Sequence, residues 1–112
     1  MWLFLSDAFL SIVRKDCPRN CLLVRARRQG DIEKVFPRAK VKRTPKADYL
    51  FRAVISQDDV ISAMENEVRR IAYGNFKESV TDKTLHDAYL RVWFTMDSLQ
   101  PNRQRNLFRG RS

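Results

Sequence analysis

The sequence predicts a single α+β domain in which one mostly antiparallel sheet carries its helices on one face. A length of 112 residues is usual for one domain. Several short segments alternate apolar and polar residues as strands do, and two longer segments repeat apolar residues with the period of a helix. The expected order is strand, strand, strand, helix, strand, strand, helix, helix. It is related to the split β-α-β arrangement of ferredoxin-like domains, with the N-terminal strands replacing the missing last strand.

Alternating residues in the first half of the chain predict five strands. Turn-forming residues separate them, among them Pro18 and Asn20 after the second strand and Pro45 before the fifth. The expected strands cover 2–5, 8–15, 22–27, 40–43 and 49–55.

The faces of two of these strands follow from the alternation. In the third strand, the helices are expected to cover Leu22, Val24 and Ala26, which leaves Leu23, Arg25 and Arg27 on the open face. In the fifth strand, the same argument favours the core for the alternate set Tyr49, Phe51, Ala53 and Ile55. The opposite orientation would place two aromatic rings on the open face.

Three helices are expected, followed by a tail. The first opens at Gly30-Asp31 and stops at Pro37. The second follows an N-cap at Ser56, and Gly74 ends it. The third begins at Thr81-Asp82 and continues to Leu99. Residues 1–99 are therefore expected to form the domain, and 100–112 a flexible basic tail without apolar periodicity.

The net charge of +9 is concentrated in the N-terminal half of the chain. Residues 1–56 hold 13 basic and five acidic side chains, whereas residues 57–99 hold five basic and eight acidic ones. Such polarity favours an acidic protein partner or nucleic acid, and it also suits a solvated face. No run of apolar residues is long enough for a membrane span, so we expect a cytoplasmic protein that does not bind membranes.

Basic residues on the predicted strands form the first candidate binding surface. The expected positions are Arg25, Arg27, Lys40, Lys42 and Arg52. With Tyr49 and Phe51 on the same face, they would resemble the surface of single-stranded RNA readers. With those rings in the core, phosphate binding would be indifferent to sequence and sensitive to salt. Leu23, Leu50 and Val54 among the arginines would instead suit a protein interface or a homodimer.

Catalytic and metal-binding patterns are weak in this sequence. His86 follows Asp82 by one helical turn, so the two side chains are placed for a carboxylate–imidazole pair, but no nucleophile motif accompanies them. Cys17, Cys21 and His86 are fewer than the four ligands of a closed zinc site. Reduced thiols are expected in the cytosol, and a disulfide between Cys17 and Cys21 is the alternative in an oxidising medium. We therefore favour a protein that is not an enzyme and has no metal or cofactor, with an active site around His86 as the minor alternative.

Three stretches carry a resemblance to a known group of proteins. They are residues 21–27 (CLLVRAR), residues 30–37 (GDIEKVFP), and NFK at 75–77 followed by LHDAY at 85–89 and VW at 92–93. This pattern resembles a family of small uncharacterised bacterial proteins over residues 3–99, a likeness that implies no activity. Core packing explains Leu85, Tyr89 and Val92. The remaining positions predict a second surface: Asn75, Phe76, Lys77, His86, Asp87 and Trp93.

These observations favour a small binding or regulatory module that recognises an acidic protein or a second copy of itself. Non-specific nucleic-acid binding through the basic sheet face and the tail is the alternative. A further hypothesis is a mobile-element interference protein of the anti-CRISPR kind, acting on a host nucleoprotein complex, which suits the size and charge. The direction of Tyr49 and Phe51 and the salt dependence of binding distinguish the first two.

Overall fold

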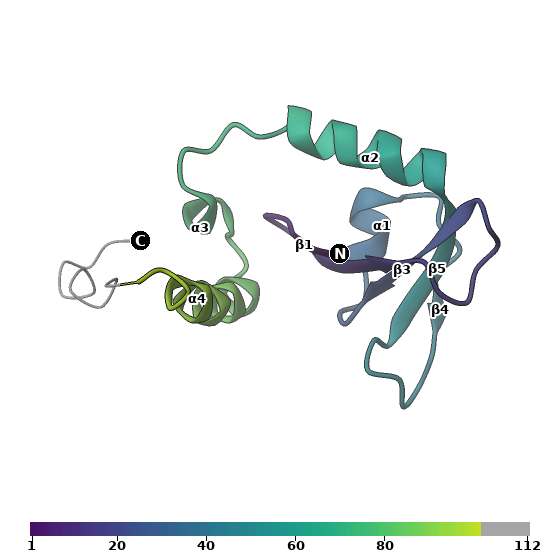
Figure 1. Cartoon of the computed structure of the whole chain (residues 1–112), viewed down its shortest axis with the longest axis horizontal. Coiled ribbons are helices and arrows are strands. Elements are labelled where there is room, and N and C mark those ends of the chain that lie inside the picture. Colours follow the sequence, from purple (N-terminus) through teal and green to yellow (C-terminus); the bar gives the residue numbers. More distant parts are fainter. Residues whose placement is uncertain (102–112) are drawn as a thin grey trace.

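The computed structural model describes residues 1–101, and these residues form one open antiparallel sheet of five strands with four helices (Figure 1). The fold class and the order of elements are confirmed, with one short helix, α3, in addition. The strands are β1 (Trp2–Phe4), β2 (Phe9–Val13), β3 (Cys21–Ala26), β4 (Lys42–Arg43) and β5 (Phe51–Ser56). The helices are α1 (Asp31–Val35), α2 (Gln57–Arg69), α3 (Phe76–Ser79) and α4 (Lys83–Asp97).

The strand order in the sheet is β1-β2-β3-β5-β4. The connection from β3 through α1 to β4 spans β5, which lies between those two strands and pairs antiparallel with both. This is the split β-α-β unit. On the other side of β3 lies β2, in the position that the last strand of a ferredoxin-like sheet would fill. The N-terminal hairpin therefore completes the sheet.

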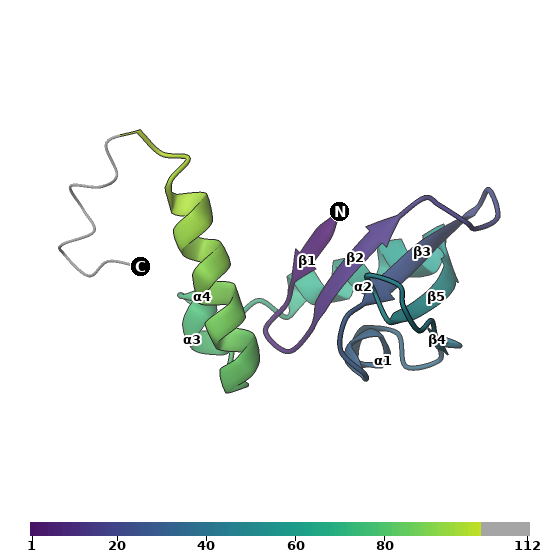
Figure 2. The same ribbon diagram turned by 90° about the horizontal axis from the view of Figure 1, so that it is seen from below.

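The main core lies between the sheet and the helices α1 and α2. Val24 and Ala26 of β3 face this core, as do Ala53 and Ile55 of β5. Ile32 of α1 is completely buried against them. Both helices cover the same face, and Figure 2 shows the sheet from its other side, with α2 behind the strands. Alternation along the strands directs the other residues to the opposite face, here called the open face, which neither of these two helices covers.

A second apolar cluster joins α3 and α4 to the hairpin of β1 and β2. Leu85 and Tyr89 of α4 are buried together with Val80, and Phe4 and Phe9 pack against them. In both views these two helices lie beyond the β1 end of the sheet, away from α1 (Figures 1 and 2). The two helices form an arm that is connected to α2 through the exposed residues 70–74.

Several expected boundaries are wrong, and each has a local reason. Strand β5 begins at Phe51, so Tyr49 belongs to the preceding turn. Helix α2 ends at Arg69, five residues before Gly74, and the apolar residues Ile71 and Tyr73 that follow it are exposed rather than packed on the main core. The added helix α3 begins after Asn75, whose side chain accepts a hydrogen bond from the amide of Lys77. Most of the expected tail, 102–112, lies outside the described residues.

The turn before α1 positions a buried carboxylate. Gly30 has a φ of 93°, in the left-handed region that glycine adopts without steric cost. Asp31 follows and is only 1% exposed. Its carboxylate accepts hydrogen bonds from the backbone amide of Phe9 (3.1 Å) and from both Nε and Nη2 of Arg28 (3.2 and 3.1 Å). This one side chain ties α1 to the start of β2.

Candidate partner-binding surfaces

The open face of the sheet carries one row of side chains that crosses all five strands. Pairing aligns Trp2 with Ser11, Ser11 with Arg25, Arg25 with Arg52, and Arg52 with Lys42. Cross-strand partners lie on the same face of a sheet. The predicted basic residues Arg25, Arg52 and Lys42 therefore lie side by side. The exposed Trp2 lies at the far end of their row.

Two arginines of this face are held against a tyrosine ring. The guanidinium carbon of Arg25 lies 4.4 Å from the ring centroid of Tyr49, and that of Arg27 lies 4.2 Å from it. The Tyr49 side chain is 3% exposed, so the ring is covered. Cation–π contacts of this kind stabilise by about 0.5–1 kcal/mol at exposed sites and more when desolvated. The two charges are thereby fixed relative to the sheet.

Polar contacts fix the same arginines further. Arg25 donates from Nη2 to the hydroxyl oxygen of Ser11 (2.8 Å), and Arg27 donates from Nη1 to the carbonyl oxygen of Asp48 (2.8 Å). The Asp48 carboxylate also lies 3.5 Å from Nη2 of Arg52. One further atom of this group, Nε of Arg25, is buried and has no hydrogen-bond partner among the described residues. Leaving a donor unpaired costs roughly 1–3 kcal/mol, which marks Arg25 as a side chain that fold stability alone does not favour.

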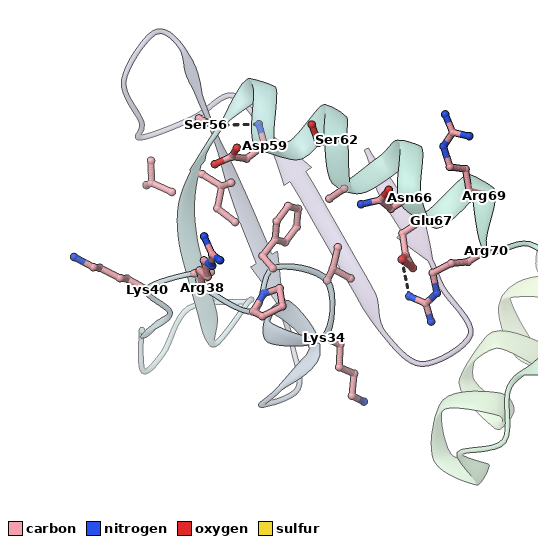
Figure 3. Close-up of a pocket in the computed structure, with 17 residues that line it drawn as sticks. Lys34, Arg38, Lys40, Ser56, Asp59, Ser62, Asn66, Glu67, Arg69 and Arg70 are labelled. Carbon is pink, nitrogen blue, oxygen red and sulfur yellow. Dashed lines mark hydrogen bonds and ion pairs between the residues drawn. The ribbon is translucent and has the colours of Figure 1, made fainter.

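The fifth predicted basic residue, Lys40, does not share a strand face with Lys42. The expected strand at 40–43 is shorter in the structure, since β4 holds only Lys42 and Arg43. Ala39 and Val41 instead pack toward the main core, which draws this segment out of the sheet. Lys40 lies on the rim of a groove of about 1000 Å³ between α2 and the segment after α1 (Figure 3).

Some residues of the second predicted surface are used in packing, and the others are partly exposed. Phe76 stacks on the ring of Tyr89, with centroids 5.7 Å apart, so it belongs to the second apolar cluster. Asn75 caps α3. Lys77 places its Nζ 4.3 Å from the ring centroid of Trp93, which joins α3 to α4. These residues are together, but their contacts serve largely to attach α3 to α4.

The expected pair of Asp82 and His86 does not form between side chains. The Asp82 carboxylate caps α4 by accepting from the amide of Leu85 (3.0 Å), and it also accepts from Nη1 of Arg28 (3.3 Å). These contacts, the capping bond foremost, lower the pKa of Asp82. The imidazole of His86 is directed toward Asp87 instead, with Nδ1 3.8 Å from Oδ1. A hydrogen bond from Lys83 is the main reason that the pKa of Asp87 is lowered.

Two features of the site were not predicted from the sequence. The first is Arg28, which links buried Asp31 with Asp82 at the start of α4, and its pKa is raised by the Asp31 hydrogen bond above all. The second is an apolar cleft of about 320 Å³ between the hairpin and α4. Its walls include Trp2, Phe4 and Val92, with Arg28 at one side. Both features depend on packing between distant parts of the chain, so no local sequence pattern predicts them.

Metal ligands, thiols and possible membrane spans were also sought in residues 1–101. No group of three or more histidine, cysteine or acidic side chains in this part is arranged to hold a metal ion. The thiols of Cys17 and Cys21 are free, and Sγ of Cys17 donates to the Cys21 carbonyl oxygen at 3.4 Å. None of the helices described is both long and apolar enough to cross a membrane.

Comparison with known proteins adds no assignment. A scan against protein-family models found no match, and neither did searches of curated proteins and of solved structures. Function is therefore inferred from the surfaces themselves.

Proposed function

We propose that this chain is a non-enzymatic binding module that recognises an acidic surface of a partner protein through the open face of its sheet. The observation that carries the proposal is the arrangement of Arg25 and Arg27 on Tyr49. Side chains that are ordered before binding lose less conformational entropy when the partner arrives. Arg52 and Lys42 continue the same positive surface across β5 and β4.

Apolar side chains on this face favour a protein over a purely ionic ligand. Trp2 is 61% exposed and Val54 is 49% exposed, at positions that flank the arginine row. Tryptophan and arginine are enriched among residues that dominate binding energies at protein interfaces. A surface that mixes the two suits a partner with both acidic and apolar groups.

The alternatives are less favoured by the same geometry. A homodimer formed sheet to sheet would bring two basic rows together, and like charges repel. Sequence-tolerant binding of single-stranded nucleic acid uses exposed aromatic rings on which bases stack. Tyr49 is covered by its arginines and Phe51 packs against the main core, so of these rings only Trp2, at the end of the row, is exposed for a base to stack on.

The test compares two variants that lose the same charge. In the face variant, Arg27, Arg52 and Lys42 become Gln; in the control, the exposed residues Lys15, Arg19 and Lys46 become Gln. Proteins captured from the native host after nuclease treatment are expected to bind wild type and control but not the face variant. Sedimentation of the purified wild type is expected to show a monomer.

Three results would contradict this proposal. The first is equal capture by both variants, which would exclude the face. The second is loss of all captured material on nuclease treatment, together with salt-sensitive binding of a single-stranded oligonucleotide, which would support the nucleic-acid alternative. The third is a dimer that the face variant dissociates.

A further inference from the structure

The outer edge of β5 is only partly covered by its neighbouring strand. Strand β4 pairs Lys42 with Arg52 and Arg43 with Phe51, and the ladder stops there. Strand β5 continues for four more residues, to Ser56. The segment that would extend β4, residues 37–41, turns toward the main core instead. An edge segment of β5 is therefore left beside the groove that Figure 3 shows.

The hydrogen-bond pattern tells which backbone groups face this edge. The amide of Thr44, just after β4, donates to the carbonyl oxygen of Leu50, just before β5 (2.6 Å). Leu50 therefore faces the β4 side. In an antiparallel ladder, residues that face the partner recur at every second position. Val54 therefore directs its N–H and C=O toward the β4 side. No backbone hydrogen bond joins Val54 to residues 37–41 within the described chain.

The groove beside this edge has the size and lining of a peptide site. Its volume of about 1000 Å³ is at the upper end of the range for small-molecule pockets. Its floor is apolar, with Phe36 and Ile55 among the lining residues, and α2 forms one wall. Polar side chains of that helix, Ser62 and Asn66, line the wall in Figure 3. An extended segment would find side-chain pockets and backbone partners together.

The charge around the groove is positive. Five basic side chains line it, against two acidic ones, Asp59 and Glu67. Glu67 is already paired with Arg70 at 2.8 Å, and Arg69 is paired outside the groove with Glu65. Arg38 and Lys40 form no ion pair with any residue in 1–101. An acidic ligand would supply the missing counter-charges.

We propose that this groove receives an extended acidic segment of a partner protein, which adds as a strand to the β5 edge at Val54. The proposal goes beyond the open-face interaction: it uses the backbone of Val54, whose side chain lies on the open face, and the charges of Arg38 and Lys40 rather than the arginine row. Two backbone hydrogen bonds at Val54 would fix the segment, and Arg38 and Lys40 would select acidic side chains. The sheet would thereby offer two separate sites to acidic partners.

The probe is a fluorescein-labelled peptide of about ten residues in which glutamate and valine alternate, a length that exceeds a typical strand. Fluorescence anisotropy is expected to show saturable binding to the full chain. Two further peptides carry backbone N-methyl groups, one at every glutamate and the other at every valine. Because an added strand directs alternate amides to the edge, one methylated peptide is expected to bind at least about tenfold more weakly than the other.

Substitutions in the chain test the same contact from the other side. Val54→Pro removes the edge-facing N–H while the ladder to β3 keeps its amides, and proline is tolerated at sheet edges. We expect roughly 3- to 10-fold weaker binding, the effect of one hydrogen bond. Val54→Thr keeps the amide and the branched shape, and it is expected to bind as wild type does. Circular dichroism establishes whether the proline variant folds, and the methylated peptides test the contact on the wild-type chain if it does not.

A matched pair of charge variants separates the groove from the open face. Arg38→Gln with Lys40→Gln is expected to weaken peptide binding by about threefold or more, whereas Arg27→Gln with Lys42→Gln is expected to leave it unchanged. The reverse result would overturn the groove proposal and support the open face alone. The proposal is also overturned by equal binding of the two methylated peptides, or by no saturable binding of the parent peptide.

Discussion

The phenolic oxygen of Tyr89 lies 2.8 Å from the carbonyl oxygen of Ala8, although the two residues are 81 positions apart in the chain. It also lies 2.9 Å from the carbonyl oxygen of Leu5. A single side chain of α4 thus closes the turn between β1 and β2. Burial is the main cause of a raised pKa for this hydroxyl, which keeps it protonated over the physiological range.

Tyr89→Phe is expected to destabilise the fold by about 1–2 kcal/mol at neutral pH, because both turn carbonyls lose the hydroxyl donor and that of Ala8 keeps only the amide of Leu5. The folded-state pKa lies above the unfolded value of about 10, so the unfolded state ionises first as the pH rises. The contribution of Tyr89 is full below pH 10 and is lost as the pH rises toward the folded pKa. Urea unfolding should therefore show the two proteins converging above pH 10. A constant difference would contradict the assignment.

Asp31→Asn is expected to cost about 2–3 kcal/mol. The carboxylate is buried, and the change leaves Arg28 without its bidentate partner. The cost is below that of a fully buried pair, since Arg28 retains access to water. Glu33→Gln, an exposed change on the same helix, is the control and should alter stability by less than about 0.5 kcal/mol. Equal unfolding free energies for the two variants would show that Asp31 does not organise this junction.

Ser56→Ala is expected to lower stability by about 1 kcal/mol. The Ser56 hydroxyl accepts a hydrogen bond from the amide of Asp59 (3.1 Å) and caps α2, the role that the sequence predicts. Ser62→Ala removes an exposed hydroxyl from the same helix and serves as the control. Thermal unfolding of both variants checks the cap. If Ser62→Ala proves the more damaging, the capping argument is wrong.

Asp82→Asn keeps a good helix cap but removes the charge that faces Arg28. Because the folded-state pKa of Asp82 is lowered, its stabilising contribution is present above the unfolded pKa and is lost as the pH falls through the folded value. Wild type should therefore unfold at a higher temperature than the variant at pH 7. Thermal midpoints that stay equally far apart below pH 3 would assign the effect to the cap rather than to the charge.

The sheet was predictable from the sequence because alternation and turn residues are local signals. Val24 and Ala26 reach the core and Arg25 the open face, as the alternation in β3 predicts. The same reasoning fails at Tyr49. The chain turns just before β5, and the ring is covered by Arg25 of β3 and by Arg27, which follows that strand; local sequence does not bring them near.

The parts of the candidate site that depend on distant segments were not predictable. Asp31 appears in the sequence as an ordinary acidic residue at the start of a helix, yet it is buried because Phe9 and Arg28 satisfy its oxygens. The free edge at Val54 depends on where β4 stops, which tertiary packing of Val41 decides. The pairing of Lys77 with Trp93 requires α3, a helix of four residues.

The exposed connection at residues 70–74 has a consequence for how the molecule opens. Within residues 1–101, the arm of α3 and α4 is attached to the rest through the hairpin contacts of Tyr89, the Ser6–Ser79 hydroxyl pair and the Arg28–Asp82 ion pair, rather than through the main core. Such a unit separates at a lower free energy than global unfolding. Amide protons of α4 would then exchange with solvent before those of β3, and each opening would bare Phe4 and Phe9.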